Sequence, residues 1–181
     1  MATTLSTLAH FLDRRNWRYQ IDPGNERILT GVQAANVAQF LIVLQLSENG
    51  EFLQFQAPQM MQVADHVYKG VLLQTMAHIE YQVKLLRLEY DPADGEVRAS
   101  ISLPLEDAPL TERQFNRCLE ALVQLVDQEA IPRLQTVLAT GEDPGQRRQI
   151  EQLAAVVPLF LMACLEGMAA LQQRPLRVDG I

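Results

Sequence analysis

Residue types that mark catalytic and nucleic-acid-binding proteins are scarce in this chain of 181 residues. It contains two cysteines, three histidines and one tryptophan, and its aromatic fraction is 6%. The 15 Lys and Arg residues are outnumbered by 22 Asp and Glu, and the longest basic runs are Arg14-Arg15 and Arg147-Arg148. Because binding to a phosphate backbone requires a concentrated positive face, the sequence predicts no nucleic-acid partner.

Motifs of catalysis and metal binding are also missing. There is no GxSxG, GxGxxG or Walker pattern, and His66 and His78 are too far apart to share a metal on one helix. Cys118 and Cys164 lie in apolar helical patterns, which predicts buried free thiols. The pair Glu142-Asp143 is expected to be solvated in a polar loop. We therefore expect a protein that is not an enzyme and has no metal and no cofactor.

The composition that remains is that of an ordinary globular protein. The apolar fraction is 48% and the charged fraction 20%, and the formal net charge is −7. A chain of this length can bury a substantial core. The first fifteen residues contain no basic segment before an apolar one, so a secretory signal is not predicted and a cytoplasmic location is expected.

Hydrophobic periodicity predicts alternating blocks of helix and strand. Helices are predicted over 4–15, 64–80, 111–141 with a bend at Pro132, and 145–172; strand patterns cover 17–21, 26–32, 38–46, 51–57, 83–91 and 97–105. Asn49-Gly50 predicts a hairpin turn. The strand after this turn, 51–57, is expected to end at Pro58. Thr111 and Gln114 form a capping-box pattern at the start of a helix.

The predicted order is α-β-β-β-α-β-β-α, with an extra C-terminal helix. Strands joined by hairpins rather than by helices predict an α+β fold with a mainly antiparallel, five-stranded sheet. We divide the chain into a domain over 1–141 and a C-terminal apolar helix and tail over 142–181, packed on the same domain or on a dimer partner.

This order, over residues 4–140, resembles the fold shared by type III secretion chaperones and the YbjN-like family. The residues that carry the resemblance are the first helix with Leu8 and Phe11, followed by NWRYQI. After them come the apolar strand FLIVLQL, the turn and antiparallel strand ENGEFLQF, and the helix and strand pair HVYKGVLLQTMAHIEYQVKLLRLEYD. Resemblance to the chaperones implies a small acidic homodimer that holds client segments on its surface. Resemblance to the YbjN-like group implies a regulatory protein with no assigned chemistry. The segment after residue 143 departs from the shared pattern.

The stretch LAAVVPLFLMACLEGMAAL, residues 153–171, carries one charge, Glu166. As a helix it would span about 28 Å, which is close to a bilayer's thickness, but Glu166, Pro158 and Gly167 disfavour insertion. An almost entirely apolar helix is usually surrounded by protein. We therefore predict a homodimer interface here, with burial within the same chain as the alternative; its candidate residues are Val156, Phe160, Leu161, Cys164 and Leu165.

A second candidate surface is the pair Met60 and Met61, between a predicted strand and a predicted helix. Packing against the sheet is one interpretation, and an adaptable apolar contact for a partner peptide is the other.

Together these patterns predict a non-catalytic interaction module, chaperone-like or regulatory, that acts as a cytoplasmic homodimer with an unidentified protein partner. Two alternatives stay open. One is an enzyme or small-ligand-binding protein whose site is built from dispersed residues in a deep pocket. The other, weaker, is peripheral or tail-anchored membrane association through 153–171.

Overall fold

The structure is a computed structural model that describes residues 2–37, 39–106 and 108–146. The chain divides into two units, Met1–Asp143 and Pro144–Ile181, and the elements below belong to the first. The predicted division into 1–141 and 142–181 stays a prediction, because most of the second segment lies outside the described residues.

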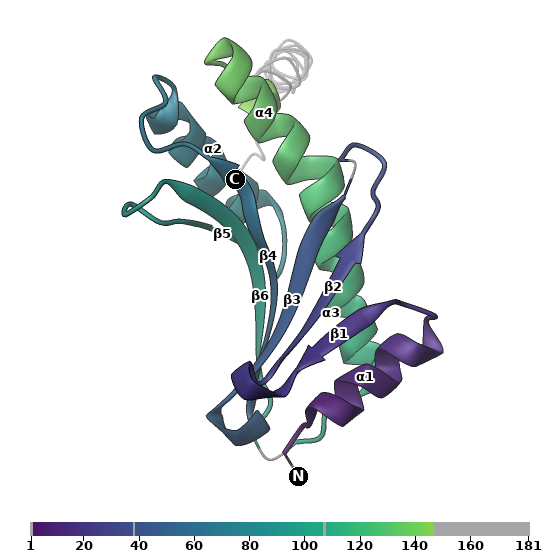
Figure 1. The fold of residues 1–181 in the computed structure, drawn as a ribbon. Coiled ribbons are helices and arrows are strands. Elements are labelled where there is room, and N and C mark those ends of the chain that lie inside the picture. Colours follow the sequence, from purple (N-terminus) through teal and green to yellow (C-terminus); the bar gives the residue numbers. More distant parts are fainter. Residues whose placement is uncertain (1, 38, 107, 147–181) are drawn as a thin grey trace, which may run out of the picture. The chain divides into compact units, whose positions relative to one another are not determined.

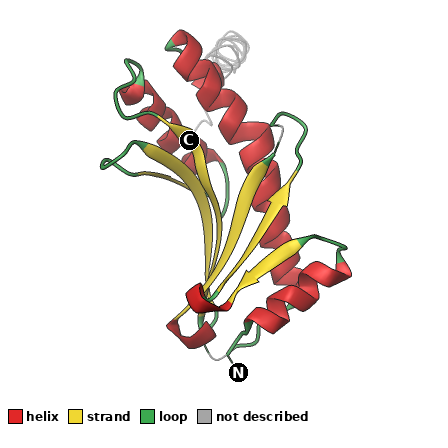
Figure 2. Ribbon diagram, viewed as in Figure 1, coloured by secondary structure: helices red, strands yellow, loops and turns green. Residues whose placement is uncertain are grey.

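Helices and strands alternate in blocks through this unit (Figures 1 and 2). The α-helices are α1 (Leu5–Arg14), α2 (Lys69–Gln82), α3 (Glu112–Gln124) and α4 (Ile131–Thr140), with a π-helical turn, η3 (Leu125–Ala130), between the last two. The strands are β1 (Tyr19–Asp22), β2 (Arg27–Val32), β3 (Phe40–Ser47), β4 (Phe52–Gln62), β5 (Arg87–Tyr90) and β6 (Glu96–Pro104).

The strands form one antiparallel sheet in the order β1-β2-β3-β4-β6-β5. The predicted α+β class and antiparallel sheet are confirmed, but the predicted number of five strands is wrong, since six are present. Four strands rather than three precede α2. The stretches on both sides of the DPGNE turn form strands and pair as a hairpin, with Tyr19 opposite Thr30 and Asp22 opposite Arg27.

One face of the sheet and the helices share a single hydrophobic core. Alternate residues of the central strands, such as Leu44, Phe55 and Ile101, are completely buried on this face. Phe115 of α3 lies with its ring 5.3 Å from that of Phe11 in α1 and 5.4 Å from that of Phe55. In Figure 1, α3 runs behind the sheet, and α4 continues from it past the upper ends of the strands. Burying such a side chain stabilises a fold by about 1.5–3 kcal/mol, so this pattern fixes which face meets the helices.

Strand β4 continues past Pro58, where the sequence predicted its end. Its register against β6 shifts between Ala57 and Met61, and Gln59 has a positive φ of 53°. A bulge leaves residues outside the hydrogen-bonded ladder, and proline, which has no N–H, is tolerated there. The strand therefore resumes after the bulge and pairs Met61 with Val97.

Helix α2 begins five residues later than the predicted start at residue 64. The preceding residues form turns, in which the His66 imidazole Nδ1 accepts a hydrogen bond from the Tyr68 N–H and the Lys69 ammonium donates to the Ala64 carbonyl. Val67, which the periodicity assigned to the buried stripe, is 82% exposed. Leu72, Thr75, Met76 and Ile79 are buried as predicted, whereas Tyr68 and Val71 of the same stripe are half-buried.

The long helical segment after residue 111 has its predicted start and bend. The Thr111 hydroxyl accepts from the Gln114 N–H, and the Gln114 side chain accepts from the Thr111 N–H, which confirms the capping box. The predicted bend at Pro132 is a π-helical turn, in which the Ile131 N–H bonds to Val126 O five residues back. Gly141 ends α4 with φ +77°.

Candidate functional site

The α-helices in the described part of the chain share the core on one face of the sheet, and its second face carries polar and apolar side chains. Its central part holds amide and hydroxyl groups: Gln54 donates to Ser102 at 3.2 Å and Gln56 donates to Gln54 at 3.0 Å. In β2 and β3 this face also carries the apolar residues Leu29, Leu41 and Val43, of which Leu41 is 45% exposed and Val43 is buried. The sequence predicted that β3 is covered on both faces, which holds for Val43 but not for Leu41 near the start of the strand.

A groove of about 570 Å³ lies on this apolar part, where β1 begins. We call it the sheet-edge groove. Its walls come from β1 and the residue before it, from β2 and from the start of β3, and include Arg18, Gln20, Leu29, Gly31, Phe40 and Leu41. Because β1 begins only opposite Thr30, the β2 backbone at Gly31 and Val32 extends beyond its neighbouring strand.

Gly31 shapes the floor of the groove. It lies opposite Leu41 in the β2–β3 ladder, and the absence of a side chain leaves a hollow beside that leucine. A Cβ added at Gly31 would have the Phe40 carbonyl oxygen as its nearest neighbour, at an ordinary contact distance of 3.7 Å. Glycine within a strand often marks a place where another backbone approaches closely. The hollow can thus be filled by mutation without a clash.

The polar groups of the groove are suited to binding rather than to acid–base catalysis. Arg18 supplies a positive charge, and Gln20, Gln33 and Gln39 supply amides; no Asp, Glu, His or Cys belongs to its lining. Tyr19 donates to Asp13 at 2.9 Å, and this hydrogen bond raises the pKa of the phenol, which stays protonated. The groove is therefore not the deep pocket with convergent titratable groups that the enzyme alternative predicted.

The two edges of the sheet differ. At β5, the side-chain carboxylate of Glu80 from α2 accepts a hydrogen bond from the Leu88 N–H, so that this backbone donor of the edge strand is already bonded. At the other edge, β1 has only four residues, and Ile21 on it is 40% exposed. A backbone edge without such a bond can pair with an added strand. This difference places the accessible edge beside the groove.

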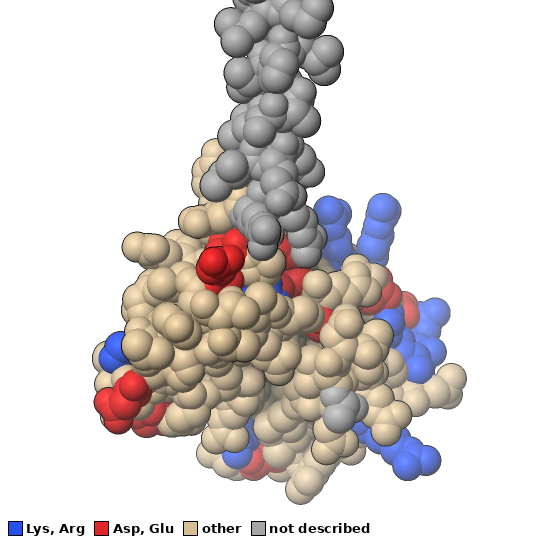
Figure 3. Space-filling model, turned by 90° about the horizontal axis from the view of Figure 1, so that it is seen from above, with Lys and Arg blue, Asp and Glu red and all other residues tan. Residues whose placement is uncertain are grey.

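Helix α2 presents a second uncharged surface. Its exposed positions include Gly70, Leu73, Gln74, Ala77 and Tyr81, of which Tyr81 is 88% exposed. Leu73, Ala77 and Tyr81 follow one another at four-residue spacing and so lie along one line. We call this line the α2 stripe. Figure 3 shows that, seen from above, much of the surface is uncharged and that basic side chains gather towards one side.

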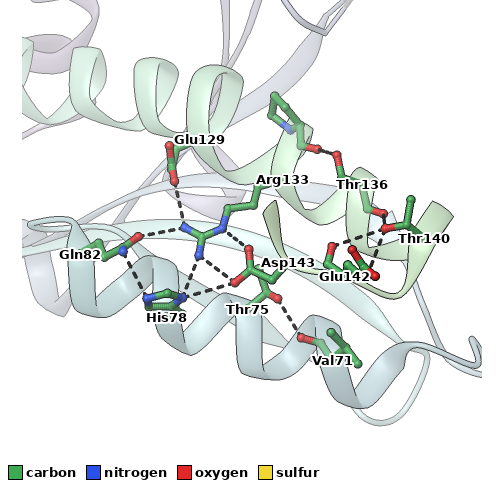
Figure 4. A network of polar contacts seen from close by, with 11 residues as sticks. Val71, Thr75, His78, Gln82, Glu129, Arg133, Thr136, Thr140, Glu142 and Asp143 are labelled. Carbon is green, nitrogen blue, oxygen red and sulfur yellow. Dashed lines mark hydrogen bonds and ion pairs between the residues drawn. The ribbon is translucent and has the colours of Figure 1, made fainter. Parts of the chain in front are cut away.

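A buried polar cluster joins α2 to α4 (Figure 4). Arg133 donates through Nε and Nη2 to the two carboxylate oxygens of Asp143, at 2.6 and 2.8 Å, and its Nη1 donates to Gln82 and Glu129. The bonds to Asp143 raise the pKa of Arg133. The prediction that Asp143 is solvated is wrong, since its side chain is 2% exposed. Its partner lies ten residues upstream, which sequence patterns do not show.

The predicted site residues have different outcomes. Met60 and Met61 lie in β4 at and after the bulge, half-buried and packed against the core; a role in partner binding stays a prediction. The candidate interface residues Val156, Phe160, Leu161, Cys164 and Leu165 lie outside the described residues. Cys118 is buried, as expected, and burial raises the pKa of its thiol, which favours the unreactive protonated form.

The described ranges hold neither a metal cluster nor a membrane-spanning helix. Within them, no three His, Cys, Asp or Glu residues are grouped so that they could hold a metal ion. None of the helices in that part of the chain has the length and apolar character needed to cross a membrane. The apolar stretch 153–171, for which membrane association was an alternative, is outside these ranges.

Sequence reasoning missed the sheet-edge groove. One signal was available, the glycine inside the strand pattern ERILTGV. The other determinants are the late start of β1 relative to β2 and the pairing of Gly31 with Leu41, and both depend on strand register.

No family model and no curated protein sequence matches this chain. Among solved structures, it is similar to YbjN from E. coli, named as a candidate transcription regulator, with a TM-score of 0.55 and 16% identity over 72% of this chain and 92% of that one. It is also similar to a chain of the ExsC–ExsE complex, with a TM-score of 0.51 and 19% identity over 72% and 95% of the two chains. The resemblance inferred from the sequence is confirmed at the level of the fold: this chain has a YbjN-like fold, of the type III secretion chaperone kind.

Proposed function

We propose that this chain is a non-catalytic, cytoplasmic protein-binding module, chaperone-like or regulatory, that binds an extended segment of a partner protein in the sheet-edge groove. The observation that carries the proposal is the groove itself, an apolar hollow beside an accessible sheet edge. An added strand can use main-chain hydrogen bonds for affinity and alternate side chains for specificity. The ExsC–ExsE complex supports the proposal, because a chain with this fold is found there with a protein partner.

The groove indicates the chemistry of the segment. An apolar side chain of the partner would fill the hollow at Gly31, between Leu29 and Leu41. An acidic side chain would face Arg18, since charge complementarity favours the correct orientation of the partner. The amides of Gln20, Gln33 and Gln39 donate and accept hydrogen bonds, and so suit a peptide backbone.

The proposed homodimer uses the α2 stripe. If two copies of α2 cross antiparallel about a two-fold axis at Ala77, Leu73 of one copy meets Tyr81 of the other, and the small alanine permits close approach. An isologous contact requires such a self-complementary surface. The C-terminal residues predicted from the sequence remain a separate candidate interface.

The experiment for the groove selects peptides from a random display library on the full chain. We expect selected peptides to lose binding by about tenfold or more to the variants Leu41→Asp and Gly31→Val. The first places a charge in the groove, and the second fills its hollow. Leu85→Asp is the matched control, since Leu85 is 48% exposed but does not line the groove. Peptides that bind Leu41→Asp and the original chain equally would contradict the proposal.

A further inference from the structure

Asp127 is a buried carboxylate whose described hydrogen bonds all come from one loop. It is 4% exposed and lies in the π-helical turn η3, on the core side of the sheet. The N–H groups of Ala35, Asn36 and Val37 donate to its two oxygens at 3.2, 2.8 and 3.2 Å, and the Asn36 side chain donates at 3.3 Å. Several donors converging on one carboxylate form strong, charge-assisted bonds.

The position of Asp127 depends on the π-helical turn. Because the Ile131 N–H bonds five residues back, the turn contains one residue more than an α-helical turn. Both Val126 and Asp127, neighbours in sequence, are buried. Val126 packs in the core, while the carboxylate of Asp127 reaches the loop between β2 and β3. Widened helical turns of this kind are frequent at functional sites.

The loop that Asp127 holds also forms the rim of the sheet-edge groove. Gln33 at its start and Gln39 at its end line the groove, whereas its middle is bonded to the helix on the other side of the sheet. A turn within the loop is closed by a hydrogen bond from the Ala34 N–H to the Val37 carbonyl, at 3.3 Å. In Figure 1 this loop lies beside the long helix, at the upper end of β2 and β3.

We propose that Asp127 is a positioning residue for the sheet-edge groove, and this inference rests on the function proposed above. Its carboxylate draws the β2–β3 loop towards the helix, so that Gln33 and Gln39 stay at the rim and the groove is open to a partner. Without the carboxylate, the loop loses its attachment, and a partner must order the loop when it binds. Ordering of interface loops is one of the principal costs of association.

The test uses a selected peptide whose binding to the full chain depends on Leu41. Asp127→Asn keeps the size of the side chain but removes its charge and one acceptor. We expect this variant to weaken peptide binding by about tenfold, although Asp127 does not line the groove. Hydrogen exchange of the Ala35, Asn36 and Val37 amides should become faster in the same variant, and Asp127→Glu should restore part of both effects.

Asp143→Asn is the matched control, because Asp143 is also a buried carboxylate of the helical layer but bonds to Arg133 instead of the loop. At a temperature where both variants are folded, it should leave loop exchange and peptide affinity unchanged. A peptide whose affinity stays within about twofold in Asp127→Asn would overturn the positioning role alone. Failure to select any Leu41-dependent peptide would instead overturn the groove as a binding site, and with it this inference.

Discussion

Gly50 is the most tightly constrained glycine of the described residues. It follows Glu48 and Asn49, which also have positive φ, and its own φ is +87°. Its carbonyl accepts a hydrogen bond from the Thr3 N–H at 3.1 Å, and an added Cβ would lie 2.1 Å from the Thr3 carbonyl oxygen. The turn therefore fixes the segment that leads into α1.

We expect Gly50→Ala to lower the free energy of unfolding by about 1–3 kcal/mol, because it combines an unfavourable φ with a backbone clash. Gly70→Ala is the control: a Cβ there meets nothing within 4 Å, and alanine should stabilise α2 by about 0.5 kcal/mol. Urea denaturation of the two variants measures both effects. If Gly50→Ala were as stable as Gly70→Ala, the segment at Thr3 would have to move away from the new Cβ at little cost in free energy.

Single residues were also where sequence patterns were least informative. The Asn49-Gly50 turn was predicted, since both residues tolerate positive φ. Asp127 and Asp143 gave no comparable signal, because a carboxylate in a helical or loop pattern is expected to face water. Their burial depends on donors that the fold brings near, from the loop at 35–37 and from Arg133.

At the scale of elements, β5 is joined to β6 by an ion pair as well as by its backbone. Glu89 accepts from Arg98 at 2.7 Å and from Ser100 at 2.9 Å. Burial acts to raise the pKa of Glu89, but these two hydrogen bonds together with the positive charges of Arg98 and Arg87 outweigh it and hold the pKa below its usual value of 4.5. The charged carboxylate is thus favoured in the folded state.

This lowered pKa predicts how stability responds to acid. The contribution of Glu89 is present above the unfolded pKa, near 4.5, and is lost as the pH falls through the lower folded pKa. We expect Glu89→Gln to make the free energy of unfolding less dependent on pH below about 4.5, and Ser100→Ala to do so partially. Urea denaturation between neutral and acidic pH measures this; an unchanged acid slope in Glu89→Gln would contradict the assignment.

Elements were more predictable than residues. Periodicity correctly predicted the helical stripes of α1, α2 and α3 and all six strand patterns, because burial repeats every 3.6 or 2 residues. It was wrong about boundaries for local reasons. Pro58 was accommodated by a bulge, and turns bonded through His66 and Lys69 delayed the start of α2. The count of five strands failed at the short hairpin around DPGNE.

At the scale of the whole molecule, the α2 stripe predicts a dimer that can be trapped chemically. In Ala77→Cys, the two new thiols would face each other across the two-fold axis and form an intermolecular disulfide under mild oxidation. Cys118 is buried and should not compete, and Cys164→Ser is introduced into both chains so that no disulfide forms through Cys164. Non-reducing electrophoresis would show the cross-linked dimer, and the original chain under the same conditions gives the background.

Charge placed on the stripe should separate the two copies. We expect Ala77→Arg to sediment as a monomer, whereas Ala139→Arg, the same change at an exposed position of α4, should behave as the original chain does. A dimer that survives Ala77→Arg and gives no Ala77→Cys cross-link would exclude the α2 stripe as its interface.

The unequal edges of the sheet limit how far copies of this protein can polymerise. Because Glu80 already accepts a hydrogen bond from the Leu88 N–H of β5, we expect hydrogen bonding between the sheets of neighbouring molecules to be favoured at the β1 side. Two molecules paired there have both used this edge, so strand pairing alone stops after a single step, and further growth requires a second interface such as the α2 stripe. Removal of the Glu80 carboxylate would free the Leu88 N–H of β5. Each molecule would then have two sheet edges available for pairing, which is the minimum for a fibre built by strand pairing alone.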